Sequence, residues 1–463
     1  MAYNSSIARP EPAAYPTWVA SLVPALPKAR VVLLLLLVSV PVIAFDPGDG
    51  FDGFFWLKVR LMLGLAVLLG AWWTVALLSR EITLERPTFL MVAGFGLLAW
   101  ATASTMVSSD PGVGVWGFPG RDDGLLVLGV NLLAFATATT LVAGKHQQLL
   151  YRVVVVVGLV VSLIAVAQHF GFDVTGLPDS LTSARSTGTF RNPLSLAGLL
   201  TMVIPLAWVA AFQVRGRFAR LAAALGLAVM LAALGCTYGR GGWLATGLAV
   251  ASFILWLILR ARPLIPRALL VLGVAVAAAA LILVLPRPAV TGAQVHSIRQ
   301  DAAQAVSPEN PRNQGRLAIW AISLRMIGDH PLLGVGPDQM GEQFAPYRTA
   351  AFDSAEGAAV TADRAHSEPL NLAVTLGIPG AVAAMTLVLV ALAAGVASGL
   401  RLPVSPPLLW QAALACGLIG YVAQSLVSIT VPGIHTLFYV LLGCLVAGGK
   451  SREKGGERLC AHH

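Results

Sequence analysis

Charge is scarce in this chain: only 11% of its 463 residues are charged, whereas 57% are hydrophobic. Soluble domains carry about 25% charged residues, so this composition excludes an ordinary soluble enzyme and is typical of a polytopic membrane protein. Cysteine is rare as well. The four cysteines lack the spacing of metal ligands, so we expect thiols buried as small apolar groups and no disulfide.

Several common functional motifs are also missing. The sequence contains no HExxH, no Asp-x-Asp and no glycine-rich phosphate loop. No internal repeat is visible, which argues against a transporter built from inverted repeats. We therefore look for function in isolated polar residues between apolar segments and expect no metal or other cofactor.

Twelve apolar segments approach the ~20 residues that a helix needs to cross a bilayer. The tenth is long, and Gly377-Ile378-Pro379-Gly380 is expected to interrupt it near its start. These features predict an all-α fold of about twelve transmembrane helices. The segments are residues 30–45, 57–79, 88–107, 124–143, 150–170, 192–213, 217–235, 241–259, 264–285, 369–398, 408–428 and 432–448.

The connections between these segments alternate in charge. With the N-terminus inside, the inner connections and tails hold eighteen of the 31 basic residues but only five of the 22 acidic ones. The positive-inside rule then places both chain ends in the cytoplasm and the long polar segment outside. The net charge of +9 reflects this orientation, so we expect a lipid bilayer and not nucleic acid as partner.

This orientation gives a domain organisation. Residues 1–29 and 449–463 are predicted to be disordered cytoplasmic tails. Transmembrane helices one to nine occupy residues 30–285, and helices ten to twelve occupy residues 368–448. Between them, residues 286–367 form one extracytoplasmic loop domain.

The loop domain has seven arginines, three histidines and no lysine. Arg316 opens a stretch that is predicted to form an amphipathic helix, because apolar residues recur at helical spacing. These residues are Leu317, Trp320, Leu324 and Ile327. As an isolated loop charge, Arg316 could equally be a solvated side chain.

Two further arginines lie on the predicted outer side. Arg191 precedes Asn192-Pro193, which can start a helix, and the helix N-terminus together with the guanidinium suits a phosphate. Arg240 lies in a glycine-rich outer turn where the backbone can approach a ligand closely. Its alternative role is to extend from the membrane to the interface.

Single polar residues near the loop domain have two readings. His366 immediately precedes the tenth apolar segment. It is either structural or a general base, whose pKa would be about 6.5 if its environment leaves it unperturbed. The adjacent Asp122 and Asp123 could ligate a metal, but beside Arg121 they are better explained as an arginine-paired loop anchor.

Several motifs follow one another between about residues 110 and 380. They are Gly117–Gly124, Gly188–Pro193, Tyr238–Gly241, Arg316 with Trp320, His330–Gly336 and Ala365–Ser367. In this order they resemble the O-antigen ligase and polymerase superfamily of bacterial envelope glycan enzymes. Ser367 follows the histidine where the family usually has asparagine, and Tyr238 occupies a position where serine is more usual.

The resemblance implies an enzyme of the inner (cytoplasmic) membrane with a fold like that of the GT-C glycosyltransferases and an active site facing the exterior. The implied donor is a glycan on undecaprenyl diphosphate, held by Arg191, Arg240 and Arg316. The histidine at position 366 is implied to activate the acceptor hydroxyl, without a metal. With no nucleophile on the enzyme, a single displacement inverts the anomeric centre.

The reactions within this superfamily share these motifs, so the acceptor stays open. A ligase would use lipid A core, a polymerase another glycan, and a protein O-oligosaccharyltransferase a protein hydroxyl. We favour a ligase-like enzyme. The alternative of another class is a multispanning transporter of bicarbonate or a lipid-linked sugar, which would need polar or broken helices at mid-membrane.

Overall fold

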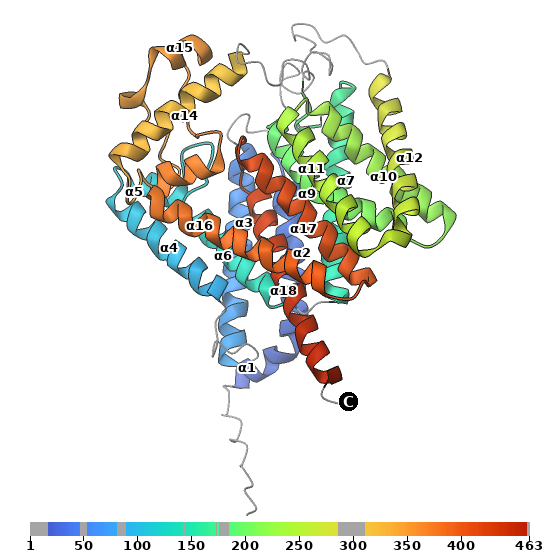
Figure 1. Ribbon diagram of the computed structural model, residues 1–463. Helices are drawn as coiled ribbons and strands as arrows, with labels where there is room; N and C mark the ends of the chain where they lie inside the picture. The colour runs from blue at the N-terminus through green and yellow to red at the C-terminus, as the bar shows by residue number, and fades with distance from the viewer. Residues whose placement is uncertain are drawn as a thin grey trace, which may run out of the picture.

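The computed structural model describes residues 17–46, 53–80, 89–141, 144–172, 174–175, 185–285 and 311–460, and every regular element in these ranges is helical (Figure 1). The elements are α1 (Thr17–Leu22), η1 (Val23–Ala25), α2 (Leu26–Ile43), α3 (Gly53–Leu78), α4 (Phe89–Val107), α5 (Pro111–Trp116), α6 (Leu125–Thr139), α7 (Lys145–His169), α9 (Pro193–Gln213), α10 (Arg217–Cys236), α11 (Arg240–Arg260), η2 (Arg262–Leu264), α12 (Ile265–Val284), α14 (Pro311–Asp329), η3 (Ala345–Tyr347), α15 (Ala350–Glu356), α16 (Glu368–Arg401), α17 (Pro406–Ser425) and α18 (Ile434–Cys460).

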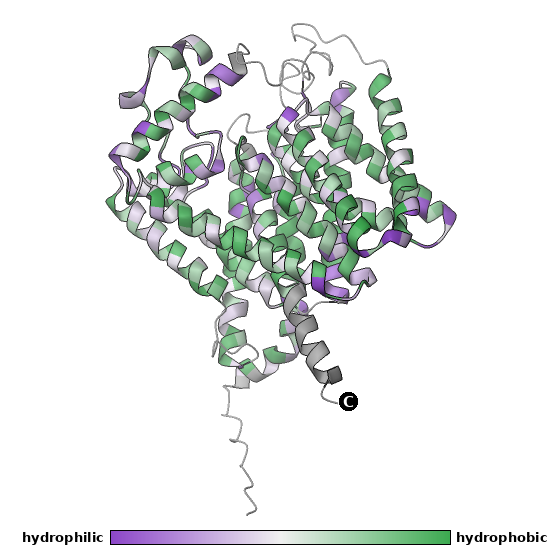
Figure 2. Cartoon of the chain, in the orientation of Figure 1, coloured by the Kyte–Doolittle hydropathy of each residue, from purple (hydrophilic) through white to green (hydrophobic). Residues whose placement is uncertain are grey.

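Ten helices in the described ranges are long and apolar enough to cross a membrane, which confirms a polytopic membrane protein. The other two predicted spans correspond to shorter apolar helices, Leu125–Thr139 and Ile434–Gly448. A count of twelve spans therefore stays a prediction. Figure 2 shows hydrophobic residues throughout the bundle and hydrophilic ones gathered around α14, α15 and the helix connections.

The core is centred on α9, whose apolar residues surround the helix axis and are almost all buried. Helix α17 packs closely on α9 and α11 because glycines face both contacts. A Cβ atom at Gly417 would lie 2.7 Å from the Met202 carbonyl oxygen, and one at Gly420 would lie 2.7 Å from that of Ala245. A larger side chain at either position would separate the helices.

Helix α16 is interrupted where the sequence predicts. Gly377 has φ 71° and ψ 174°, outside the helical region. The amide of Ile378 donates to the Pro331 carbonyl at 2.9 Å, and that of Val335 donates to the Val374 carbonyl at 2.8 Å. The break thus lets the segment after α14 pair with the first turns of α16.

Helix α14 is present, and of the apolar residues at helical spacing Ile327 packs against a small buried cluster. The helix begins at Pro311, and Leu317 and Leu324 are more than half exposed. The fully buried residues of α14 are those that face α15 and the start of α16, because the helix packs against the apolar side chains of both. They are Ala318, Ile319, Ile322 and Met326.

The predicted disordered tails are partly helical. Helix α1 and the start of α2 lie within residues 1–29, and α18 continues to Cys460. The N-terminal part is held by tertiary contacts, since Trp72 donates to the Leu26 carbonyl at 2.9 Å. In Figure 1, α1 and the end of α18 lie at one end of the molecule, and α14 and α15 lie at the other.

Candidate functional site

Arg191 lies in the turn directly before α9, and the residues of this turn have the backbone conformations that it requires. Gly188 has φ 58°, and Arg191 itself has φ 58°, so both occupy the left-handed region. The side chain of Asn192 then accepts a hydrogen bond from the Leu194 amide at 2.8 Å and caps the helix. The predicted start of this helix is confirmed, and it places Arg191 beside a positive helix terminus.

Arg240 is the first residue of α11, next to the N-terminus of α9. Gly242 faces Ala197 so closely that a Cβ atom at position 242 would overlap it. Gly242 therefore serves helix packing. Arg185 ties the two turns together, because its guanidinium donates to the carbonyl oxygens of Thr237 at 2.8 Å and Tyr238 at 3.4 Å. Two helix N-termini that each begin beside an arginine thus adjoin.

A buried lysine supports the Arg191 turn from behind. Lys58, on α3, is completely buried and donates to the carbonyl oxygens of Pro41 at 2.9 Å and Ala44 at 2.5 Å. These carbonyls are at the C-terminal end of α2, where a cation is favourable. The ammonium also lies 5.0 Å from the ring centre of Phe190, the residue before Arg191. Lys58 therefore fixes α2, α3 and the turn to one another.

His366 lies in the described part of the loop domain and is largely buried. Its backbone has φ 50°, an uncommon conformation for a residue other than glycine. Burial, together with the positive charge of the nearby Arg316, lowers the pKa of His366 to about 4. The pKa of about 6.5 expected for an unperturbed histidine therefore does not apply, because His366 is neither exposed nor distant from cations.

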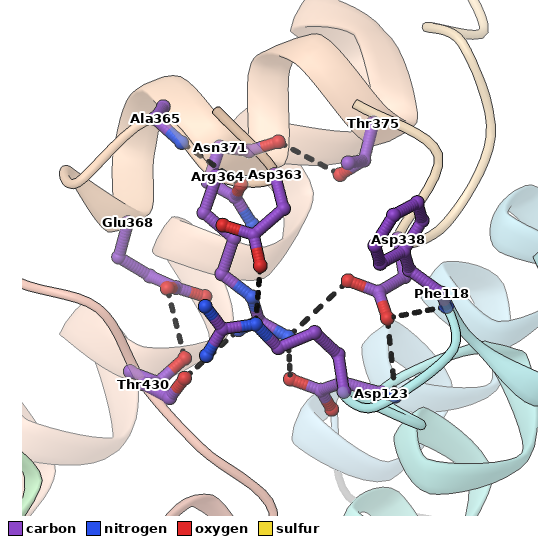
Figure 3. Close-up of polar contacts among 11 residues, drawn as sticks. Phe118, Asp123, Asp338, Asp363, Arg364, Ala365, Glu368, Asn371, Thr375 and Thr430 are labelled. Atoms are coloured by element: carbon purple, nitrogen blue, oxygen red, sulfur yellow. Dashed lines mark hydrogen bonds and ion pairs between the residues drawn. The ribbon is translucent and has the colours of Figure 1, made fainter. Parts of the chain in front are cut away.

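The segment that carries His366 is held by a buried charge cluster made of Arg364, Asp123 and Asp338 (Figure 3). The Arg364 guanidinium lies 2.9 Å from Asp123 Oδ2 and 3.2 Å from Asp338 Oδ1. It also donates to the Thr430 carbonyl at 2.8 Å. Four separate stretches of the chain therefore meet at one guanidinium two residues before His366.

Hydrogen bonds from the backbone complete the cluster. Asp338 Oδ2 accepts from the amides of Phe118 at 2.8 Å and Asp123 at 3.2 Å. Burial raises the pKa of Asp338 to about 6, although the Arg364 charge opposes this shift. Burial lowers the pKa of Arg364, but the two carboxylates outweigh it and raise that pKa overall. At neutral pH the cluster is an ion triad with one excess negative charge.

The outer acids behave as loop anchors. Asp123 pairs with Arg364, and Arg121 pairs with Asp363 on the His366 segment. This arrangement agrees with the arginine-paired interpretation, although Arg121 is not the partner of Asp123. Both pairs fix the loop before α6 against the start of α16.

The connection between α17 and α18 links the two halves of this region. Val427 lies beside the start of α11, 3.7 Å from the position of a Cβ atom on Gly241. Further along, Thr430 contacts Arg364 through its carbonyl and donates to Glu368 Oε2 through its hydroxyl at 3.0 Å. The connection thus contacts the start of α11 at Val427 and the segment that carries His366 at Thr430.

Sequence reasoning missed Lys58, Arg185, Arg364 and Asp338. A signal existed for Lys58, because a lysine within an apolar span is costly without a function or a partner. Arg364 and Asp338 gave no such signal, since arginines and acids are ordinary in a polar loop.

Residues 225–385 match the family model described as O-Antigen ligase. The match runs from α10 into α16 and includes Arg240, Arg316 and His366, whereas Arg191 precedes it. It supports the resemblance to the O-antigen ligase and polymerase superfamily that the motifs indicate. No curated protein matches the chain.

Proposed function

We propose, from the premise that the chain belongs to the O-antigen ligase and polymerase superfamily, that it is a membrane glycosyltransferase with a lipid-linked donor. The donor would be a glycan on undecaprenyl diphosphate, and the product a glycan on an acceptor hydroxyl at the outer face of the membrane. Both chain ends would lie in the cytoplasm, as the charge asymmetry predicts.

The observation that carries this proposal is the environment of His366. A histidine with a pKa of about 4 is uncharged at neutral pH, so its free nitrogen can take a proton from a hydroxyl. Nδ1 of His366 is buried without a hydrogen-bond partner among the described residues. An uncharged imidazole beside Arg316 fits a base next to an anion-binding group.

The arginines supply the second requirement. When a glycosyl–diphosphate bond breaks, negative charge develops on the departing diphosphate. Permanent cations in a partly desolvated site stabilise that charge more than they stabilise the intact donor, which accelerates the reaction. Arg191, Arg240 and Arg316 would fill this role, because the guanidinium can pair with phosphate through two hydrogen bonds.

Donor binding would also strengthen the base. A diphosphate beside Arg316 offsets the positive charge that lowers the pKa of His366. The pKa of the histidine would then rise towards neutrality, where a general base is most effective. The acceptor hydroxyl would attack the anomeric carbon, its proton would pass to His366, and undecaprenyl diphosphate would leave with inversion.

The test uses purified protein in liposomes with a fluorescent oligosaccharide on undecaprenyl diphosphate and membrane extract as the source of acceptors. Release of undecaprenyl diphosphate reports transfer whichever acceptor is used. Arg191→Ala, Arg240→Ala and Arg316→Ala should each abolish release, and lysine should restore it only partly. Arg325→Ala, on the same helix as Arg316, is the matched control and should keep activity. Full release by all three alanine variants would refute the proposal.

A further inference from the structure

A cavity of about 390 Å³ lies between α3, α4 and α6. Helices α3 and α4 each pack against α6 but scarcely against each other, so a groove remains between them over the surface of α6. Its walls are apolar side chains from all three helices. The groove is therefore a gap in the packing of three membrane-embedded helices.

Two glycines keep this groove open. Gly94 of α4 and Gly129 of α6 both line it. Small residues in membrane helices usually let neighbouring helices approach closely. Here the nearest atoms from other parts of the described chain would lie 3.6 Å from a Cβ atom at Gly94 and 3.9 Å from one at Gly129, which is ordinary contact. Both positions accept a side chain without moving the backbone, so these glycines leave space that the protein itself does not fill.

Water is a poor occupant of this groove. A water molecule needs only ~10–15 Å³, but it also needs about two to four polar partners. Among the described residues that line the groove, Trp73 carries the only side-chain N–H or O–H group, and its indole N–H already donates to Thr137 Oγ1 at 2.9 Å. The Thr137 hydroxyl in turn donates to the Leu133 carbonyl at 2.7 Å. The groove therefore suits a hydrocarbon chain.

The groove opens to the bilayer near one end of the bundle. Phe95 of α4 is 65% exposed and Leu77 of α3 is 38% exposed, and both line the groove. Leu77 lies in the last turn of α3, and Leu90, also in the lining, lies in the first turn of α4. In the orientation predicted from the charge asymmetry, these helix ends are cytoplasmic. The groove thus lies in the cytoplasmic half of the membrane.

Two cations lie at the cytoplasmic end of the groove. Arg30 donates to the Thr140 carbonyl at 3.0 Å and to the Thr140 hydroxyl oxygen at 3.1 Å. Thr140 follows Ala136, which lines the groove, by one helical turn. Arg80 is exposed and follows Leu77 by three residues. A guanidinium can pair with phosphate through two hydrogen bonds, so this end of the groove is complementary to a phosphate at the membrane surface.

We infer that the groove between α3, α4 and α6 binds one acyl chain of a phospholipid from the cytoplasmic leaflet, with the phosphate of its head group near Arg30 and Arg80. This lipid is neither the donor nor the acceptor of the proposed reaction. The donor diphosphate would instead bind at Arg191 and Arg240, on the outer side of the membrane. The inference is therefore independent of the proposed function.

The bound chain would join α4 to α6, and the outer ends of these two helices hold the loop domain. After α4, the Ser108 hydroxyl oxygen accepts from Gln339 Nε2 at 2.7 Å. Before α6, Asp123 pairs with Arg364 at 2.9 Å. Occupation of the groove should therefore stabilise the fold, and the temperature of thermal unfolding should rise when the lipid binds.

The experiment uses full-length protein in dodecyl maltoside micelles and phosphatidylethanolamine that carries a diazirine in one acyl chain. After irradiation, labelled positions are mapped by peptide mass spectrometry at increasing ratios of lipid to protein. Labelling of α4 and α6 should saturate, as expected for a single site. Labelling of α12, where Leu270 is 68% exposed, should keep rising, as expected for non-specific contact with lipid. Unlabelled phosphatidylethanolamine should displace the probe more effectively than undecaprenyl phosphate does.

Gly94→Leu and Gly129→Leu each place a side chain in the groove and should abolish the saturable labelling. Gly96→Leu is the matched control, because Gly96 is exposed on the same helix as Gly94 and a Cβ atom there would meet no atom within 4 Å in the described chain. Phosphatidylethanolamine should raise the unfolding temperature of the wild type and of Gly96→Leu but not of the two filled variants. A cooperative thermal transition shows that each variant is folded. Saturable labelling that persists in both filled variants, its absence from the wild type, or stronger displacement by undecaprenyl phosphate would overturn the inference.

Discussion

The buried state of His366 should appear in the pH dependence of stability. In the folded chain, burial and the Arg316 charge hold the pKa of this histidine at about 4, whereas in the unfolded chain it returns to about 6.5. Between these values the unfolded chain binds more protons, so the stabilisation is complete above pH 6.5 and is lost as the pH falls. From pH 7 to pH 5 the loss amounts to about 2 kcal/mol.

The perturbation is His366→Gln, which removes the titrating group and keeps a polar side chain. Asp338 has the opposite effect, because burial raises its pKa to about 6 and its contribution grows as the pH falls. Asp338 is present in both proteins, so its effect cancels in their difference. The assay is equilibrium unfolding by denaturant in detergent micelles at a series of pH values.

Relative to His366→Gln, the wild type should lose about 2 kcal/mol of unfolding free energy between pH 7 and pH 5. His330→Gln is the control, since His330 is exposed at the end of α14, and its curve should run parallel to that of the wild type. If the unfolding free energies of the wild type and of His366→Gln changed with pH in parallel, the histidine would protonate as freely in the folded chain as in the unfolded chain. The argument for an uncharged base would then be wrong.

Three further predictions concern the scaffold. Arg364→Met should lower the unfolding free energy by about 3–5 kcal/mol because it leaves two buried carboxylates unpaired, whereas Arg348→Met, at a more exposed ion pair, should cost less than about 1 kcal/mol in the same assay. Lys58→Met should cost about 1–3 kcal/mol and weaken donor binding, measured by fluorescence titration, because the α2 carbonyls and the Arg191 turn lose their support. An impermeant thiol reagent applied outside cells should label a cysteine at Ser354 but not one at Ala219; the reverse pattern would contradict the orientation.

Local features of the fold could be read from the sequence. Each apolar span is a continuous run, and a helix in a bilayer satisfies its own backbone hydrogen bonds, so the pattern alone specifies a helix. The same holds for the break at Gly377 and the cap at Asn192, where residue type and immediate neighbours decide the conformation.

Structural features that depend on residues far apart in the chain could not be predicted from the sequence. Arg364 contacts Asp123, which is 241 positions away in the sequence, and Thr430, which is 66 positions away. Contacts at such separations leave no periodic pattern in the sequence. The buried face of α14 depends on α15 and α16, so helical spacing alone does not specify which residues are buried. The pKa of His366 depends on burial and on Arg316, both of which are tertiary properties.

Glycan transfer by His366→Ala tests the central claim most directly. Purified variant and wild type are compared for release of undecaprenyl diphosphate from the fluorescent donor, and donor binding is measured in parallel. Our account predicts that transfer falls by about 10²–10⁴-fold, the contribution of a general base, while donor binding is retained through the arginines. Transfer by His366→Ala at the wild-type rate would contradict it.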